Sequence, residues 1–472
     1  MSIARPPGPH SPYFGLGLLR QMQRDYLGFW HKAQQAHGDT VYILVAGRDT
    51  YSFMHPDQIR EVLVDKASSF IRYQRHMRVL SELHGQSVLI TEGDTWRKQR
   101  RTLQPGFSPK RYDGYARQMG ESASRVLDQL PCSANEAIDF EHAMNMLAMD
   151  VILSTMFSAA PPSDTADIEK AVSLLSRTAY EEMFYPASLP DWLPLPSKRA
   201  KRKAMKLLDD LIWSHIKARR NSGQVHDDLL GMLLTATDSE GDASLLSDQQ
   251  VRDQLMTAFL AGHETTASGL TWAGWVLASH PDIAQRAAHE VDQVLQGRTP
   301  GFADLAQLPF VGQVIKETLR LYSPATGVFM RRAVEDVQIG EWMVPSGALV
   351  SILSTIPQRD ARWFPDPDRF DPERFAPEAS KRIPRGAYFP FGTGPRVCIG
   401  NSFATMEMTM ILAMLLQRRV LRPAPGQRQP GMRMQVTMRP EGGMRLILDK
   451  REALAVGIPP AQSAPAGCPF HA

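Results

Sequence analysis

The sequence contains very little cysteine. Only three of its 472 residues are cysteines, Cys132, Cys398 and Cys468, and they lie far apart. An odd, scattered set does not form the disulfide framework of a small secreted protein, so we expect a reducing, cytoplasmic location. Paired Cys-x-x-Cys spacings are also missing, which argues against a zinc or iron–sulfur cage.

Excess charge and long apolar runs are missing as well. The formal net charge is only +3, so we expect no general attraction to nucleic acid or to an anionic membrane. No run approaches the roughly 18 apolar residues of a membrane span, and the proline-rich segment 1–12 has no signal-peptide core. We therefore expect no membrane anchor and no nucleic-acid partner.

Hydrophobic spacing predicts the local elements. Helical periods cover residues 15–37, 58–65, 134–157, 167–183 and 247–279, and period-two alternation predicts strands within 40–54 and 328–353. Residues 432–438 and 444–448 are predicted to pair as a hairpin. No repeat or linker divides the chain, so we expect one catalytic domain over 1–455 and a disordered tail over 456–472, which is rich in Pro, Ala and Gly.

Two segments between these elements lead to further predictions. Four prolines between Tyr185 and Pro196 predict a mobile loop, because proline does not fit a helix interior. A basic cluster follows, and we interpret it as the solvated face of a helix. Its members are Lys198, Arg199, Lys201, Arg202 and Lys203.

The longest predicted helix carries an unusual segment. Ser247 and Gln250 form a capping-box pattern at its start, and His280-Pro281 ends it. Its middle reads Ala261-Gly-His-Glu264-Thr265-Thr, although glycine and threonine weaken or bend a helix. Such a break of a local rule is expected at a functional site. The small Ala-Gly pair lets a flat ligand approach the backbone, and a carboxylate beside a hydroxyl can relay protons.

Cys398 lies in a loop rich in glycine and aromatics, just before a predicted helix over 401–418. A thiol at a helix N-terminus beside Arg396 is poised to ionise, and a thiolate is a nucleophile or a metal ligand. A nucleophile needs a base, and no histidine is close in the sequence. These features favour a single axial thiolate to haem iron, with a buried inert cysteine on a glycine-rich turn as the alternative.

The pattern Phe391-x-x-Gly394-x-Arg396-x-Cys398-x-Gly400 resembles the haem-binding signature of the cytochrome P-450 family. The segment 261–266 resembles the family's oxygen-activating motif, which implies that Glu264 and Thr265 deliver protons and that Ala261 lies above the haem. Other matches imply contacts to the haem propionates and a structural triad. The propionate contacts are Trp96, Arg100, Arg331 and Arg396, with the adjacent Arg332 as the alternative to Arg331. The triad is Glu317, Arg320 and Arg374.

This resemblance implies a fold and an activity. The fold is mainly α with a smaller β-rich region, in which the long central helix lies over the haem and the Cys398 loop lies beneath it. The activity is that of a monooxygenase with haem b, which inserts one oxygen atom from O₂ into a C–H bond. Its substrate would be a hydrophobic small molecule such as a fatty acid, terpenoid or steroid.

The resemblance also implies partners and leaves alternatives open. NAD(P)H electrons would arrive through a ferredoxin or flavodoxin with its reductase, attracted by Arg97, Lys98 and Arg101, and we expect a monomer. Residues 72–90, 180–200 and 322–330 would line the substrate pocket, with Thr326, Val328 and Phe329 near the haem. Gln358 stands where the family more often has histidine. The alternatives are a haem-thiolate peroxygenase or isomerase, and a haem-binding sensor without turnover.

Overall fold

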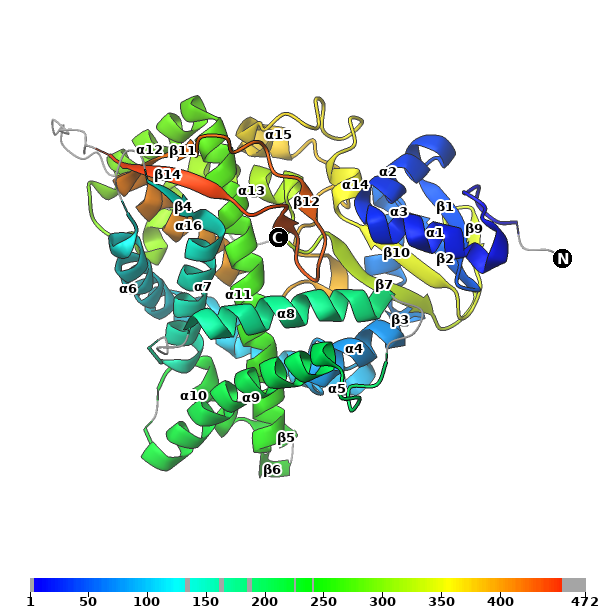
Figure 1. The fold of residues 1–472 in the computed structure, drawn as a ribbon, viewed down its shortest axis with the longest axis horizontal. Coiled ribbons are helices and arrows are strands. Elements are labelled where there is room, and N and C mark those ends of the chain that lie inside the picture. Colours follow the sequence, from blue (N-terminus) through cyan, green and yellow to red (C-terminus); the bar gives the residue numbers. More distant parts are fainter. Residues whose placement is uncertain are drawn as a thin grey trace.

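The computed structural model describes residues 4–131, 136–160, 165–184, 189–224, 226–239 and 242–451. Figure 1 shows a large helical part around the long helix α11 and a smaller part built on a sheet beside the N-terminal helices. The predicted fold class, mainly α with a smaller β-rich region, is therefore confirmed. The predicted tail lies outside the described residues, and a single domain over 1–455 stays a prediction.

The smaller part is built on a five-stranded sheet with the order β1-β2-β10-β7-β3. Its strands are β1 (Thr40–Val45), β2 (Arg48–Phe53), β10 (Leu349–Leu353), β7 (Gly327–Ala333) and β3 (Phe70–Arg72). β10 runs parallel to β2, and the other neighbours are antiparallel. The predicted hairpin over 40–54 is confirmed, and the sheet brings its strands together with the later segment 327–353.

Two helices cover this sheet where one was predicted. α1 (Pro12–Arg24) and α2 (Tyr26–His37) are separated at Asp25, so the prediction of a single helix over 15–37 was wrong. The Asp25 carboxylate accepts a hydrogen bond from the Gly28 N–H at 2.8 Å, which caps the start of the second helix.

The larger part consists of eleven longer helices in the described residues. They are α4 (Gln74–His84), α5 (Gly93–Leu103), α6 (Tyr112–Gln129), α7 (Phe140–Phe157), α8 (Thr165–Phe184), α9 (Pro196–Ser222), α10 (Leu229–Thr235), α11 (Asp248–Ser279), α12 (Pro281–Leu295), α13 (Pro309–Leu321) and α16 (Asn401–Arg418). Short turns include α3 (Pro56–Arg60), the π-helical η1 (Glu61–Asp65), α14 (Thr355–Gln358) and α15 (Pro377–Ser380). No helix within the described ranges has both the length and the apolarity to cross a membrane.

Helix α11 is the axis of the molecule. The Gln250 N–H donates to the Ser247 hydroxyl at 3.2 Å, and the Gln250 side chain accepts from the Ser247 N–H at 2.8 Å. The predicted capping box is therefore confirmed, as is the end of the helix before His280. Most of the helix is buried, and it packs against α7, α13 and α16. This packing fixes the segment 261–266 in the interior.

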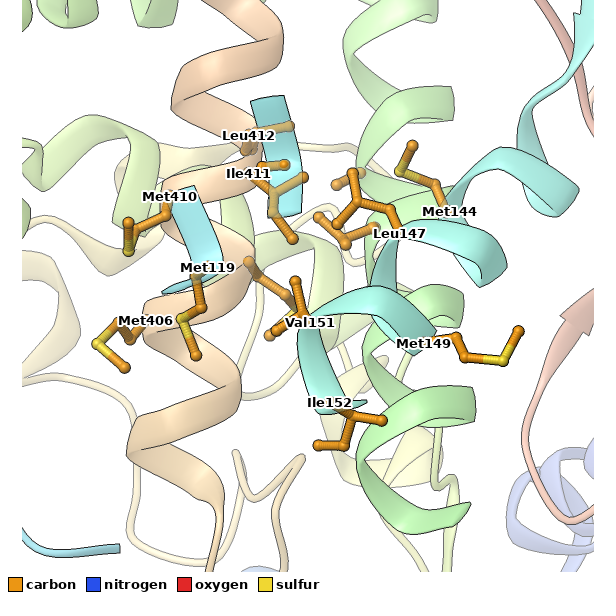
Figure 2. Close-up of a cluster of buried hydrophobic side chains, with 14 of the residues drawn as sticks. Met119, Met144, Leu147, Met149, Val151, Ile152, Met406, Met410, Ile411 and Leu412 are labelled. Atoms are coloured by element: carbon orange, nitrogen blue, oxygen red, sulfur yellow. The ribbon is translucent and has the colours of Figure 1, made fainter. Parts of the chain in front are cut away.

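The main core lies between α6, α7, α11 and α16, and it is rich in methionine. Figure 2 shows Met119 of α6 and Val151 of α7 beside Met406 and Met410 of α16. Methionine adapts to irregular gaps, which suits a core where helices meet at several angles. Helix α16 follows Cys398 directly, so this core anchors the loop that carries the thiol.

The predicted hairpin over 432–448 was wrong. β14 (Arg445–Lys450) pairs with β11 (Arg419–Pro423) and with β4 (Ala137–Asp139) in a three-stranded sheet. Residues 432–440 form only a short ladder between β12 (Met432–Arg433) and β13 (Arg439–Pro440). The chain turns at Gly442 and Gly443, which both have positive φ. The strand that follows, β14, lies in a different sheet from β12 and β13.

The strand β4 also corrects the predicted helix over 134–157. Asp139 accepts a hydrogen bond from the His142 N–H at 3.0 Å and so caps α7, which begins only at Phe140. Two further ladders lie at the periphery, β5 (Thr237–Ser239) with β6 (Asp242–Leu245) and β8 (Val337–Ile339) with β9 (Trp342–Val344).

The basic cluster on α9 is not simply a solvated face. Lys198 and Lys201 are buried, and the Lys201 Nζ lies 2.5 Å from Glu82, 2.8 Å from Glu182 and 2.7 Å from Asp191. Lys198 pairs with Glu182 and Asp191 as well. The prediction of a solvated face was therefore wrong for these two lysines, because α4, α8 and the segment before α9 supply carboxylates. Part of the predicted loop, residues 185–188, lies outside the described residues.

Candidate active site

Cys398 lies at the end of a tightly folded loop. Its N–H donates to the carbonyl of Phe391 at 2.9 Å. Gly394 has a φ of +73°, and a Cβ there would come within 1.9 Å of the Leu63 carbonyl oxygen in η1. Only glycine allows this approach, so the motif glycine fixes the loop against η1. Phe391 packs on the main core, and Gly400 is the N-cap residue of α16.

The Cys398 thiol is surrounded by protein yet accessible to solvent. This combination is expected for a side chain that faces an internal space. Burial raises the pKa of the thiol, whereas the Gly400 N–H and the Arg100 charge lower it. The prediction that the thiol is poised to ionise was therefore wrong for the chain alone, and a cation at the sulfur is needed to hold the thiolate.

Three guanidinium groups and a single carboxylate gather beside this loop. Arg72 Nε lies 2.8 Å from Glu92 Oε1, and the Arg396 guanidinium pairs with the other Glu92 oxygen. Burial and the nearby charge of Arg72 lower the pKa of Arg331 to about 10 and that of Arg396 to about 9. The cluster is thus short of negative charge.

These residues fit a haem. Three arginines and one glutamate leave two positive charges in excess, and a haem carries two propionate carboxylates that can balance them with charge-assisted hydrogen bonds. On α11, Ala261 is exposed although most of its helix is buried, so this face also leaves room for a flat group. The Cys398 thiol would supply a soft sulfur donor of the kind that haem iron accepts.

Helix α5 presents the two residues predicted from its sequence. Arg100 Nη1 donates to the Val397 carbonyl at 2.8 Å, one residue before the cysteine. The Arg396 guanidinium lies over the Trp96 ring, 3.8 Å from its centroid. Both predicted residues therefore lie beside the Cys398 loop, with Trp96 oriented by a cation–π contact.

The predicted triad is present and buried. Arg320 Nε lies 2.7 Å from Glu317 with both side chains fully buried, and Arg374 Nε lies 3.4 Å from the same carboxylate. Gln358 connects this group to the site. Its Nε2 donates to the Arg320 carbonyl at 3.0 Å, and its Oε1 accepts from the Phe389 N–H at 3.1 Å. The triad thus holds the start of the Cys398 loop through Gln358.

The middle of α11 contains the side-chain hydrogen bond that its sequence predicts, within a helix that is continuous from Asp248 to Ser279. The Thr265 hydroxyl donates to the Ala261 carbonyl at 2.6 Å, as expected for a threonine that weakens a helix locally. A Cβ on Gly262 would lie 2.5 Å from the Ile152 side chain, so glycine allows α7 and α11 to pack closely.

Glu264 has a partner that the sequence did not reveal. Its Oε1 lies 2.7 Å from Arg439 Nη2, and Arg439 Nη1 lies 3.2 Å from Glu141. All three side chains are mostly buried. Burial raises the pKa of Glu264, and Arg439 opposes this rise.

Sequence reasoning missed Arg72, Glu92, Glu141 and Arg439. None belongs to a recognisable motif, and each reaches the site through a pairing between distant segments. The only available signal was indirect, since a buried glutamate requires a partner.

An apolar cluster gathers the segments predicted to line the substrate pocket. Met77, Leu80, Ile90 and Met183 form its buried part, and Phe329 packs against them. The Thr326 hydroxyl donates to the Met434 sulfur at 3.0 Å. The predicted ranges 72–90, 180–200 and 322–330 thus meet here, whereas the side chain of Val328 lies outside the described part of the structure.

The fold and these residues together fit a haem-thiolate protein, and the comparisons identify the family. The family model described as Cytochrome P450 matches residues 6–447, so this chain belongs to the cytochrome P450 family. Cyclooctatin synthase of Streptomyces melanosporofaciens is 35% identical over 88% of this chain and 90% of its own length.

Two further relatives also match most of this chain over most of their own length. Cyclooctat-9-en-7-ol 5-monooxygenase of Streptomyces melanosporofaciens is 33% identical over 83% of this chain and 84% of its own length. Pentalenene oxygenase of Streptomyces avermitilis is 31% identical over 85% of this chain and 88% of its own length. The chain is therefore a monooxygenase that uses haem and O₂, with NAD(P)H electrons delivered through partner proteins.

Proposed function

We propose that this monooxygenase hydroxylates a C–H bond of a carbocyclic terpenoid, with Cys398 as the axial ligand of the haem iron. When bound, the haem supplies the redox centre at which dioxygen is reduced and one oxygen atom is inserted. The observation that carries this proposal is the pair Glu264 and Thr265 in the middle of the buried helix α11. A buried acid beside a hydroxyl can move protons where bulk water is excluded.

The residues around the cysteine have separate roles in this proposal. Arg100, Arg331 and Arg396 bind the propionates, and Trp96 orients Arg396. Gly400 supplies an N–H to the sulfur, and Phe391 holds the loop through its carbonyl, which accepts from the Cys398 N–H. Ala261 leaves space on the opposite face. The triad of Glu317, Arg320 and Arg374 is structural, because it is linked through Gln358 to the Phe389 N–H at the start of the Cys398 loop.

The substrate class is inferred from the relatives and the apolar cluster. The name of one relative specifies the cyclic alkenol cyclooctat-9-en-7-ol, and the name of another specifies the alkene pentalenene. Both compounds are terpenoids. The apolar side chains of Met77, Met183 and Phe329 gather at this place, which suits a hydrophobic substrate. A terpenoid therefore fits better than a fatty acid, whose carboxylate would need a partner.

The electron donor, location and assembly complete the proposal. A ferredoxin or flavodoxin with its reductase docks on α5, where Arg97, Lys98 and Arg101 are exposed on the helix whose Arg100 touches the Cys398 loop. An acidic donor suits this basic surface. We place the enzyme in the cytoplasm as a monomer, in keeping with its few, scattered cysteines.

A spectroscopic screen tests the substrate class. Terpenoids, fatty acids and steroids are added to the ferric protein, and the shift of the haem absorption band that accompanies displacement of the water ligand is recorded. A terpenoid should give the largest shift, and labelled O₂ should then supply the oxygen of its hydroxylated product. A response to fatty acids alone would contradict the terpenoid proposal, and label derived only from peroxide would favour a peroxygenase.

The proton path is tested by Thr265→Ala, with Thr265→Ser as the matched control that restores a hydroxyl. In the alanine variant, product formed per electron consumed should fall by at least about tenfold, with the electrons recovered as hydrogen peroxide. The serine variant should recover most of the coupling. A haem sensor or an isomerase would instead tolerate the alanine, because neither needs protons for dioxygen.

A further inference from the structure

Glu92 connects three segments of the chain beside the Cys398 loop. Its Oε1 accepts from the Arg72 backbone N–H at 3.1 Å and from the Arg72 Nε at 2.8 Å. Its Oε2 pairs with the Arg396 guanidinium. Arg72 belongs to β3, Glu92 is the N-cap residue of α5, and Arg396 lies shortly before Cys398. One carboxylate therefore joins a strand, a helix and the loop that carries the thiol.

The Glu92 side chain does not serve the helix that it begins. An acidic side chain at a helix start is ordinarily explained by a cap on the first turn or by the helix dipole. Within the described residues, the Glu92 side chain makes no such cap. Its oxygens accept from Arg72 and Arg396 instead. The carboxylate therefore acts on the arginines beside the thiol.

The Arg396 guanidinium is oriented by three groups. It lies over the Trp96 ring, 3.8 Å from the ring centroid, and its Nη1 donates to the Thr91 carbonyl at 3.1 Å. Its Nη2 donates to Glu92. The ring and the carbonyl are neutral, so Glu92 supplies the negative charge in this arrangement. The contact to Glu92 is thus the one that both orients the guanidinium and offsets its charge.

These charges are shielded enough from water to matter. The side chains of Arg72 and Arg396 are only 5% and 19% exposed, and that of Glu92 is 32% exposed. Burial, followed by the nearby charges of Arg72 and Arg331, lowers the pKa of Arg396 to about 9, and Glu92 opposes this fall. With the two propionates of a haem, the three arginines and Glu92 form a group without net charge. Loss of the Glu92 carboxylate would leave that group one positive charge in excess.

We propose that Glu92 is a positioning residue for the haem, which orients Arg396 for a propionate and lowers the reduction potential of the haem iron. Reduction of ferric iron adds one negative charge, which nearby arginines favour and a nearby carboxylate opposes. Glu92 acts through Arg396 and through its own charge. This inference rests on the proposed binding of the propionates by Arg331 and Arg396.

A redox titration of the holoenzyme with mediator dyes, without substrate or donor protein, measures the effect of the charge. At the ambient potential that half-reduces the wild type, Glu92→Gln should raise the ratio of ferrous to ferric haem by at least about twofold. Glu92→Asp keeps the charge and should stay closer to wild type. The control Asp94→Asn removes a fully solvated carboxylate of the same helix and should change the ratio much less. An unchanged ratio in Glu92→Gln, or an equal rise in Asp94→Asn, would overturn the proposal.

A double variant separates the effect of charge from structural damage. Glu92→Gln combined with Arg72→Gln removes one negative and one positive charge, so the ratio should return toward the wild-type value. Damage alone gives no such return, because the second substitution removes further hydrogen bonds of Arg72. A double variant whose ratio stays at the Glu92→Gln value, or moves beyond it, would show that charge is not the cause.

Resonance Raman spectra of the same proteins test the positioning of Arg396. The bending band of a haem propionate depends on its hydrogen bonds, so it should shift in Glu92→Gln and stay in place in Asp94→Asn. Arg331→Gln and Arg396→Gln should also shift this band, and they should lower the ferrous-to-ferric ratio. If neither arginine variant changed either readout, the proposed binding of the propionates would fail. If both did and Glu92→Gln did not, only the role of Glu92 would fail.

Discussion

Arg331 and Arg332 are adjacent, yet strand β7 turns their side chains to opposite faces. Arg331 lies opposite Arg72 in the register with β3 and acts electrostatically on both Arg72 and Arg396. The sequence alone could not decide which of the two arginines faces the haem, because both fit the motif spacing. The structure places Arg331 in the cationic cluster, and its contact to a propionate stays a prediction.

A matched pair of variants tests this assignment. Arg331→Gln should speed the loss of haem to an acceptor protein by about tenfold or more, since a charge-assisted hydrogen bond to a propionate contributes about 1.5–3 kcal/mol. Arg332→Gln should stay within about twofold of wild type. Equal rates for the two variants, or a larger effect of Arg332→Gln, would contradict the placement of Arg331 at a propionate.

At the scale of elements, local signals predicted helix α11 and the hairpin over 40–54, but they missed the break at Asp25, the strand β4 and the partners of β14. Helix α11 was predicted from its capping box to its last residue, because the cap and the stop are both local. The partners of β14 could not be read in the same way, since β11 and β4 are remote in the sequence. The motif residues of the site were likewise predictable, whereas Arg72 and Arg439 enter it only through tertiary contacts.

The burial of two lysines of α9 could likewise not be predicted from local sequence, because their carboxylate partners lie on other segments. These lysines lead to a separate prediction. Lys201→Met should lower the free energy of unfolding by on the order of 3 kcal/mol, because it leaves only Lys198 to neutralise Glu182 and Asp191. The control Lys203→Met, at an exposed position of the same helix, should change it by less than about 0.5 kcal/mol. Chemical denaturation of the holoenzyme measures both, and equal effects would rule out a stabilising network.

For the whole molecule, three buried histidines make stability depend on pH. Burial lowers the pKa of His76, His84 and His263 to about 4, from 6.5 in the unfolded chain. The unfolded chain therefore binds more protons as pH falls. Stability should be full above about pH 6.5 and decline toward about pH 4, by up to about 3 kcal/mol for each histidine.

His84 offers the clearest test, since its Nδ1 lies 3.1 Å from the Thr257 hydroxyl. His84→Gln retains a polar side chain at this place but cannot titrate, so the variant should lose less stability than wild type between about pH 7 and about pH 5. Thermal unfolding at several pH values provides the comparison. His289→Gln, at an exposed position, should follow wild type. A His84 variant with unchanged acid sensitivity would show that this histidine does not contribute.

The central claim is that Cys398 binds the haem iron as a thiolate, and the carbon monoxide spectrum of the reduced protein tests it most directly. The wild type and the variants Cys132→Ser and Cys468→Ser should all show the long-wavelength band that gives the family its name. Cys398→Ser should lack that band, whether or not it retains haem. Persistence of the band in Cys398→Ser, or its loss in either control, would contradict the assignment.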